Sequence, residues 1–410
     1  MSKSLLIIGH VWPEPKSSAA GSRMMQLIET FQHKNYDITF ATSCAKSENA
    51  FDLTSIGIEQ VGIELNASSF DVFVQQLNPQ MVLFDRFMTE EQFGWRVAEQ
   101  CPNALRILDT EDLHCLRKGR QQACKAGKTF SDEYLFNDIA KRELASIFRC
   151  DLSLIISEVE MKILKENFKV PDELLLYLPF MLEEITEERI KNLSKFQERT
   201  NFITIGNFLH EPNYDAILFL KESIWPIIKK QLPDSELHVY GAYASQKVNQ
   251  LHNTKEGFII KGFVDDVDVV IQNAKICLAP LRFGAGLKGK LIDAMQNGTP
   301  CVMTSIAAEG MFGDCNPNGI VEDAPEVFAK NAVELYRDES LWNEKQKVAI
   351  KIINQRFNKI KFQNRLFLKI EELRSTLQHH RLYNFTGQML QHHTMQSTKY
   401  MGKWIEEKNK

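Results

Sequence analysis

The sequence predicts an α/β protein with two successive domains, each built on a parallel β-sheet covered by helices on both faces, followed by a helical tail. Three observations lead to this prediction. The chain has 410 residues, enough for two domains of ordinary size. Short apolar strands alternate with amphipathic helices, and the strands are near-continuous apolar runs, as is typical of parallel sheets. The alternation then starts afresh after a charged segment, Leu182 to Glu198.

The composition excludes several classes of protein. Hydrophobic residues make up 44% of the chain, charged residues 25%, and the formal net charge is -4, which argues against nucleic acid as the main partner. No apolar run approaches the ~20 residues needed to span a bilayer. The eight cysteines form no CxxC pair. We therefore expect reduced thiols in a cytoplasmic protein, and neither a disulfide framework nor a zinc site.

The first domain is predicted over residues 1–185. It opens with a strand at Leu5–His10 and a loop of small residues, which leads into a helix from about Arg23. The loop lacks GxGxxG, but Gly21 allows it to pass close to a ligand; a plain turn with a solvated arginine is an equally supported interpretation. The later strands of this domain are predicted at Tyr36–Thr42, Met81–Arg86, Ala104–His114, Asp151–Ser157 and Leu174–Pro179.

Polar residues gather where these strands end. Asp85, Arg86, Asp112 and His114 follow two apolar runs, and ligands of parallel sheets bind beyond the carboxyl ends of the strands. We therefore expect His114 to face a cleft. The basic stretch Arg117–Lys128 is interpreted as a solvated loop or helix face, although it could also meet an anionic acceptor or a membrane surface.

The second domain is predicted over residues 186–357 and the tail over 358–410. The strands of the second domain are expected at Asn201–Asn207, Glu236–Ala242, Gly257–Phe263, Ile276–Leu281 and Pro300–Ile306. Two such domains of similar size imply a cleft between them. The tail is basic and contains aromatic residues, so it could pack back on the first domain or contact a partner.

An anion site is indicated within the stretch Cys277–Gly310. Lys288 and Lys290 fall in the first turns of a predicted helix, where the helix dipole makes a cation unfavourable by roughly 0.3 to 1 kcal/mol. A bound anion removes this conflict. Arg282, the lysines and the backbone amides of Phe283–Leu287 would together hold a phosphate or diphosphate.

The acids Asp265, Asp266 and Asp268 raise the alternative of a metal site. They precede a predicted helix, however, and Asp is a preferred N-cap residue that also complements the helix dipole. We therefore expect no metal.

Three stretches carry a resemblance to a known family: Gly206–Pro226, Lys261–Val267 and the APLRFGAGLKGKLIDAMQNGTP run within Ala279–Gly310. They resemble, in order and spacing, the donor domain of the retaining GT-B glycosyltransferases of family 4, which have two Rossmann-like domains. The first half is similar through HVWPEPKSSAAGSR and DTEDLH, and FGAGLKGK resembles a subgroup of the family.

The resemblance implies a function. It implies metal-independent transfer of a hexosyl or related sugar, with retention, from a nucleotide-diphosphate sugar to a hydroxyl of a glycan or lipid-linked glycan. Such enzymes act in cell-surface polysaccharide or lipopolysaccharide biosynthesis, in the cytoplasm or at the inner face of the membrane. No cofactor is implied beyond the donor substrate, and a peripheral membrane contact is conceivable.

The resemblance also implies roles for individual residues. Arg282 and Lys288 would neutralise the diphosphate leaving group, and His114 would contact the sugar near the reacting carbon. Asp293 stands where the family has a glutamate that bonds the ribose. The positions that would bind the nucleotide-sugar are Gly21, Asn207, Gly241, Phe263, Val264, Phe283, Gly284, Ala285, Gly286, Leu287 and Asp293. The acceptor would meet Arg23, Arg86 and Asp112.

Two departures from the family pattern keep rival functions open. Ala285 stands where many members have a glutamate, and Asn207 and His210 replace an arginine and a lysine. A nucleotide-sugar 2-epimerase or a pyridoxal-dependent phosphorylase would use the same architecture. A non-catalytic nucleotide-sugar-binding protein is favoured by Ala285.

Overall fold

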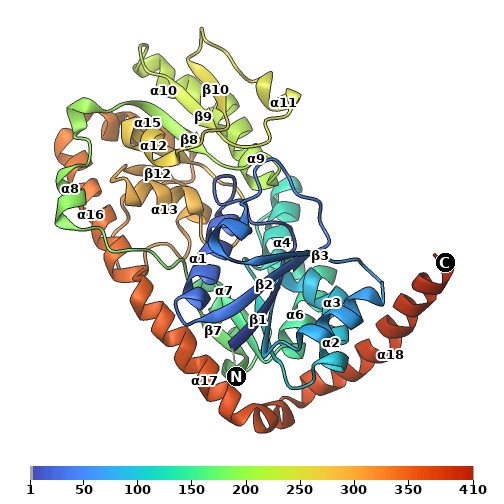
Figure 1. The fold of residues 1–410 in the computed structure, drawn as a ribbon. Coiled ribbons are helices and arrows are strands. Elements are labelled where there is room, and N and C mark those ends of the chain that lie inside the picture. The colour runs from blue at the N-terminus through green and yellow to red at the C-terminus, as the bar shows by residue number, and fades with distance from the viewer. Residues whose placement is uncertain (1–2, 410) are drawn as a thin grey trace.

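Two parallel β-sheets form the framework of the chain. The computed structural model describes residues 3–409. The first sheet has seven strands in the order β3-β2-β1-β4-β5-β6-β7, and the second has six in the order β10-β9-β8-β11-β12-β13. Every pairing between neighbouring strands is parallel. Helices cover both faces of each sheet (Figure 1). The predicted fold class, two Rossmann-like domains with C-terminal helices, is confirmed.

The first domain alternates strands and helices. The strands are β1 Lys3–Ile8, β2 Tyr36–Thr42, β3 Glu59–Gly62, β4 Met81–Asp85, β5 Leu105–Asp109, β6 Leu152–Ile155 and β7 Leu175–Tyr177. The helices are α1 Ala19–Gln32, α2 Ser69–Leu77, α3 Arg86–Gln100, α4 His114–Lys125, α5 Asp132–Leu135, α6 Asp138–Arg149 and α7 Glu158–Glu166. The central strands β4 and β6 are buried along their whole length, which explains their unbroken apolar sequence.

The second domain repeats this alternation. Its strands are β8 Thr200–Ile205, β9 Leu237–Tyr240, β10 Phe258–Gly262, β11 Ala274–Ala279, β12 Cys301–Met303 and β13 Gly319–Val321. Its helices are α8 Glu187–Lys191, α9 Glu211–Phe219, α10 Trp225–Gln231, α11 Gln246–Asn249, α12 Val267–Asn273, α13 Gly289–Gln296, α14 Ser305–Ala308, α15 Pro325–Arg337 and α16 Glu339–Arg356. A π-helical turn at Leu220–Ile224 joins α9 to α10 just before Pro226, which has no N–H to continue an α-helical ladder.

The chain crosses between the domains at two adjacent points. Leu182 N donates to Phe357 O over 2.7 Å, and Lys359 N donates to Leu182 O over 3.0 Å. After the second crossing, α17 (Lys359–Tyr383) lies on the first domain, where Phe362, Leu366 and other apolar side chains join its core. Helix α18 (Phe385–Lys408) then runs along α6 and α3 to the edge of the molecule (Figure 1).

Some element boundaries differ from the sequence prediction. The strand expected at Ala104–His114 is too long: β5 ends at Asp109, and α4 begins at His114. Glu111 turns the chain between them with a φ of 61°, a conformation that no strand residue adopts. Helix α1 begins at Ala19, four residues before the predicted Arg23. Within residues 3–409, no helix is long and apolar enough to cross a bilayer.

The first domain was predicted to begin at residue 1 and the tail to end at residue 410. Residues 1–2 and 410 lie outside the part of the chain that the structure describes.

Candidate functional site

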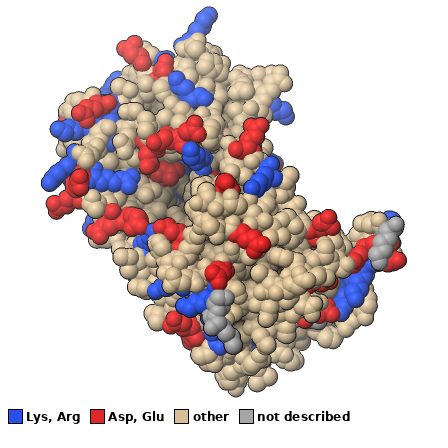
Figure 2. Space-filling model, in the orientation of Figure 1, with Lys and Arg blue, Asp and Glu red and all other residues tan. Residues whose placement is uncertain are grey.

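A cavity of about 1050 Å³ lies between the two domains, at the carboxyl ends of both sheets. It is visible as a hollow with charged side chains at its rim (Figure 2). The loops that follow β1, β4 and β5 line it from the first domain, and the loops that follow β8, β9, β10 and β11 line it from the second. Ligands of open parallel sheets bind at this end of the strands. The cavity is therefore the candidate site.

Two helix N-termini meet in this cavity. Helix α1 starts after its N-cap Ser18, whose hydroxyl accepts from Gly21 N over 3.0 Å. Helix α13 starts at Gly289 in the facing domain, and a Cβ added to Gly289 would lie 2.6 Å from the Cβ of Ala19. Neither helix has an acidic residue in its first turn. The two positive helix ends thus point to one place, and neither is balanced by an acid in its own first turn.

Two buried lysines add to this positive charge. Lys288 is 6% exposed and Lys290 is 9% exposed, and both line the cavity. Lys288 Nζ donates to Gly286 O over 2.7 Å, which ties it to its own loop. Lys290 has no hydrogen-bond or ion-pair partner within residues 3–409, and burial lowers its pKa to about 8. An anion in the cavity would raise the pKa of Lys290 again by stabilising its charged form.

Asp293 lies one turn further along α13. Its side chain also faces the cavity, and burial raises its pKa to about 7. Asp268 raises the pKa further by charge repulsion, while Lys290 lowers it. A buried carboxyl group of this kind is well suited to bond the hydroxyls of a ligand.

The loop before α13 reaches across the cleft into the first domain. Gly286 N donates to Glu160 Oε1 of α7 over 2.8 Å, and the same oxygen accepts from Leu113 N over 2.9 Å. Gly286 has a φ of 63°, and an added Cβ would lie 2.8 Å from the Cβ of Asp112. Ala285 packs against the apolar core of the first domain. Ala285 and Gly286 thus take part in the contact between the two domains.

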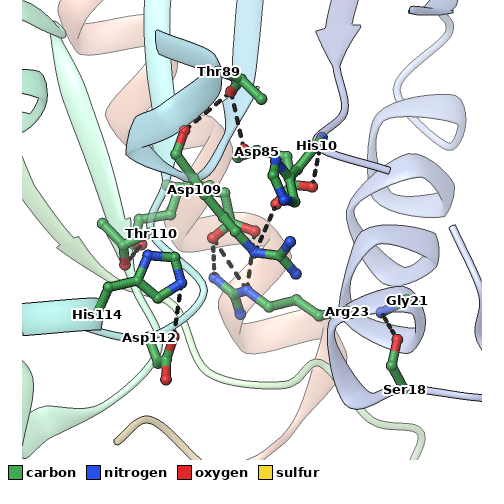
Figure 3. A network of polar contacts seen from close by, with 12 residues as sticks. His10, Ser18, Gly21, Arg23, Asp85, Thr89, Asp109, Thr110, Asp112 and His114 are labelled. Carbon is green, nitrogen blue, oxygen red and sulfur yellow. Dashed lines mark hydrogen bonds and ion pairs between the residues drawn. The ribbon is translucent and has the colours of Figure 1, made fainter. Parts of the chain in front are cut away.

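His114 lies at the first residue of α4, where it faces the cavity. Its Nε2 is 3.5 Å from Asp112 Oδ1 (Figure 3). Its ring contacts Phe87 edge-on. Burial lowers the pKa of His114 to about 3, so the imidazole is neutral at physiological pH. A neutral imidazole can donate or accept one hydrogen bond at a ligand.

Strained residues mark the first-domain end of the cavity. Arg86 and Glu111, which follow β4 and β5, have φ values of 70° and 61°. Asp85 Oδ1 and Glu111 Oε1 are buried and accept no hydrogen bond, although their residues line the cavity. Strain and unsatisfied polar atoms both concentrate at functional sites. Both oxygens are buried, and Asp85 Oδ1 lies 3.7 Å from Arg86 Nε, so a ligand would reach them only after neighbouring side chains moved.

The acceptor contact expected for Arg23 is corrected by the structure. Arg23 is 1% exposed and does not line the cavity. Its guanidinium forms a buried pair with Asp109 at 2.8 Å (Figure 3). It also donates to Leu178 O over 2.7 Å. Arg23 therefore holds the ends of β5 and β7 together beneath the site.

Arg282 does not lie in the cavity, where it was expected to bind a diphosphate. Its side chain is 42% exposed, pairs with Asp215 of α9 and lies over the ring of Phe219, outside the cavity. The distance from Arg282 Nε to Asp215 Oδ2 is 2.8 Å. This pairing satisfies the guanidinium without a ligand, so Arg282 does not belong to the site in this structure.

The other predicted positions come together. The cavity is lined by Gly21, Arg86, Asp112, His114, Asn207, Gly241, Phe263, Val264, Phe283, Gly284, Ala285, Gly286, Leu287, Lys288 and Asp293. Lys290, expected with Lys288 at the anion site, also lines the cavity. Sequence reasoning did not assign Glu111, which lines the cavity, or Glu160, which bonds the loop beside it. Nothing in the sequence distinguishes Glu160 from the solvated acids of α7.

Asp266, one of the three aspartates that raised the alternative of a metal site, is the N-cap of α12. Asp266 caps α12 by accepting from Asp268 N over 3.0 Å and from Val269 N over 3.4 Å. Across residues 3–409, no group of three or more His, Cys, Asp or Glu side chains is arranged to hold a metal ion.

Comparisons with known proteins agree with this geometry. Residues 199–338 match the family described as "Glycosyl transferases group 1". A Klebsiella pneumoniae protein described as an uncharacterized 44.6 kDa protein in the cps region is 22% identical over 235 residues. That match covers 55% of this chain and 57% of the relative.

Solved structures share the fold. Sucrose-phosphate synthase from Thermosynechococcus elongatus has a TM-score of 0.66 at 13% identity, over 91% of this chain and 100% of that one. HepE of Anabaena, solved in complex with UDP and glucose, has a TM-score of 0.65 at 12% identity, over 90% and 99%. TarM of S. aureus has a TM-score of 0.67 at 10% identity, over 90% and 99%. The chain is thus similar to the group 1 glycosyl transferase family over residues 199–338, within its second domain.

Proposed function

We propose that this chain is a retaining glycosyltransferase that moves a sugar from a nucleotide-diphosphate sugar to a hydroxyl of a glycan or lipid-linked glycan. The observation that carries the proposal is the meeting of two helix N-termini and two buried lysines in one cavity. Breaking the anomeric C–O bond leaves an anionic diphosphate. Preorganised positive charge at that anion lowers the barrier directly and requires no metal.

The donor is proposed to lie against the second domain. Lys290 binds the diphosphate, and Lys288 holds the loop through Gly286 O while its positive charge faces the same space. Asp293 bonds the ribose hydroxyls, and Phe263 lies at the end of β10, where a base can pack on it. These roles rest on the positions of the side chains in the cavity and on the family match.

The acceptor is proposed to lie against the first domain. Asp85 and Glu111 line the first-domain end of the cavity where the acceptor would lie, and His114 bonds the transferred sugar between the two ends of the cavity. Retention follows when the acceptor hydroxyl attacks from the face that the diphosphate leaves. The departing phosphate oxygen then takes the hydroxyl proton, so no protein base is needed.

A role in cell-surface polysaccharide biosynthesis is part of the proposal. The Klebsiella relative is described by its place in a cps region, and WaaG, which shares the fold with a TM-score of 0.58, is described as a glycosyltransferase involved in lipopolysaccharide biosynthesis. Both support an acceptor that is itself a glycan or a lipid-linked glycan.

A two-stage experiment tests the function. Thermal shift against UDP-, GDP-, ADP- and CMP-sugars identifies the donor, because a ligand of the native state raises the Tm in proportion to its occupancy. Release of the nucleotide product is then measured with and without glycan acceptors. Glycan-dependent release supports the proposal. Binding without turnover on any acceptor would instead support a non-catalytic nucleotide-sugar-binding protein.

A further inference from the structure

Helix α4 carries most of the basic stretch Arg117–Lys128, which the sequence analysis interprets as a solvated face. The three lysines of the stretch are exposed, as expected. The side chain of Arg120, however, is only 10% exposed, because it contacts the second domain. Helix α4 lies beside α9 of that domain (Figure 1), and Gln121 donates to Glu211 at this boundary. One arginine of the stretch is thus part of the contact between the domains.

Arg120 binds two loops of the second domain at once. Its Nη1 donates to Gly284 O over 2.9 Å and to Glu309 Oε1 over 2.8 Å. Its Nη2 donates to Glu309 Oε2 over 2.7 Å. The guanidinium also lies over the ring of Phe130, 5.5 Å from the ring centroid. Charge-assisted bonds from a planar guanidinium fix both the distance and the orientation of their partners.

The bond to Gly284 O determines how the next backbone amide is turned. In a planar trans peptide the C=O and the N–H point to opposite sides, so the Ala285 N–H points away from the carbonyl that Arg120 holds. A glycine beside this peptide would otherwise let it rotate easily. Within residues 3–409 the Ala285 N–H donates no hydrogen bond, although Ala285 lines the cavity. Arg120 thus orients an amide that has no acceptor in the protein.

Arg120 also pairs with the carboxylate that acts most strongly on Lys288. Burial lowers the pKa of Lys288 to about 8, while the charge of Glu309 raises it and the charge of Arg120 lowers it. Glu309 is nevertheless bonded to Arg120, and Lys288 Nζ donates to Gly286 O. In the described part of the chain, Lys288 forms no ion pair with Glu309. Without Arg120, the Glu309 carboxylate would compete with a ligand anion for the Lys288 ammonium.

We propose that Arg120 is a positioning residue for the donor diphosphate: it holds the peptide between Gly284 and Ala285 in one orientation and keeps Glu309 from pairing with Lys288. The inference rests on the function proposed for the cleft, because it assigns the anion beside Lys288 to a nucleotide-sugar. It gives α4 of the first domain a part in binding a donor that lies against the second domain.

Calorimetric titration of the full chain with UDP, GDP, ADP and dTDP in parallel arms tests the inference. Arg120→Gln should raise the Kd of the bound diphosphate about tenfold, because it releases both Gly284 O and the Glu309 carboxylate. Glu309→Gln removes the competing carboxylate and should change the Kd by less than about threefold. The double variant should therefore bind more tightly than Arg120→Gln alone. An ion pair that only joined the domains would instead give equal losses in the two single variants and no recovery in the double variant.

Glu158→Gln is the matched control. Glu158 of α7 pairs with Arg356 of α16 at 2.8 Å, and neither residue lines the cavity, so this variant loses an interdomain ion pair and should keep the wild-type Kd.

Thermal unfolding without ligand shows whether each variant is folded. If Arg120→Gln does not fold, Arg120→Lys keeps the charge without the planar fork and should still raise the Kd about threefold or more. A wild-type Kd in the folded Arg120 variant, or equal losses in Arg120→Gln and Glu309→Gln, would overturn this inference alone. A wild type that binds none of the four diphosphates would overturn the function proposed for the cleft, and this inference with it.

Discussion

Glu160 of the first domain accepts a hydrogen bond from the backbone amide of Gly286 in the second domain, over 2.8 Å. Its other oxygen is buried and has no partner, and burial raises the pKa of Glu160 to about 8, with Asp112 adding to the shift. A protonated side chain at neutral pH accounts for both observations. One buried carboxylic acid thus joins the two halves of the site.

This pairing makes the stability of the chain depend on pH. The pKa of Glu160 in the unfolded chain is near 4.5, so its stabilising effect is complete below about pH 4.5 and is lost as the pH rises through 8. Glu160→Gln, which cannot ionise, should therefore gain stability relative to the wild type between about pH 5 and about pH 9. Urea unfolding of both proteins at the two pH values measures this. If the difference in unfolding free energy between the variant and the wild type is the same at both pH values, Glu160 is not protonated at neutral pH.

The two cations near the donor end should behave differently on substitution. Lys290→Ala removes a buried ammonium that faces the cavity, and should lower turnover of the nucleotide-sugar by ~10² or more. Arg282→Ala is the matched control, because Arg282 pairs with Asp215 outside the cavity and should change turnover by less than about tenfold. Steady-state kinetics with one donor decide between them. A larger loss from Arg282→Ala would mean that Arg282 turns toward the diphosphate when the donor binds.

Substitution of His114 should lower the rate of the reaction more than it weakens binding of the donor. His114→Ala removes a hydrogen-bonding group from the middle of the cavity, and should lower kcat by ~10² while the thermal shift with the donor is kept. Because its pKa is about 3, protonation of His114 should not limit activity above about pH 5. Normal kinetics of the variant with both donor and acceptor would assign His114 a structural role.

The close approach of Gly289 to Ala19 predicts that a larger side chain at residue 289 would push the two helices apart. Gly289→Ala places a Cβ 2.6 Å from that of Ala19 and should force the two helix N-termini apart. We expect kcat/KM to fall roughly 10- to 100-fold, because small displacements of catalytic groups are costly. The double variant Gly289→Ala, Ala19→Gly restores the space and should recover most of the loss. Equal kinetics of the single and double variants would show that the helix ends are not held this close during turnover.

The buried pair beneath the site should support folding. Arg23→Met leaves Asp109 as an uncompensated buried charge and should destabilise the chain by about 3–5 kcal/mol. Replacing both partners, Arg23→Met with Asp109→Leu, should recover part of this loss, although Leu178 O still lacks its donor. Chemical denaturation measures both values. A double variant less stable than Arg23→Met alone would show that Asp109 has further stabilising partners.

The fold and the second-domain lining of the cavity could be predicted from the sequence for physical reasons. Buried parallel strands impose unbroken apolar runs such as Met81–Phe84, and a cationic helix start such as Lys288–Lys290 conflicts with the helix dipole unless an anion is present. Both signals come from residues that are close together in the sequence, so they can be recognised without knowledge of tertiary contacts.

The remaining features depend on partners that are distant in the sequence. An arginine such as Arg23 looks the same in the sequence whether it faces a ligand or a buried aspartate 86 residues away. The same is true of Arg282, whose partner Asp215 comes from another helix. Glu160 reads as a surface acid of α7 until the loop at Gly286 is placed against it.

The two adjacent crossings between the domains, at Leu182 and at Phe357–Lys359, have a mechanical consequence. Because the two segments are hydrogen-bonded to each other, they form a single joint between the domains. A hinge opening about this joint would move the first domain together with α17 and α18, which are packed onto it. It would open the cleft widest along the rim that lies farthest from the joint.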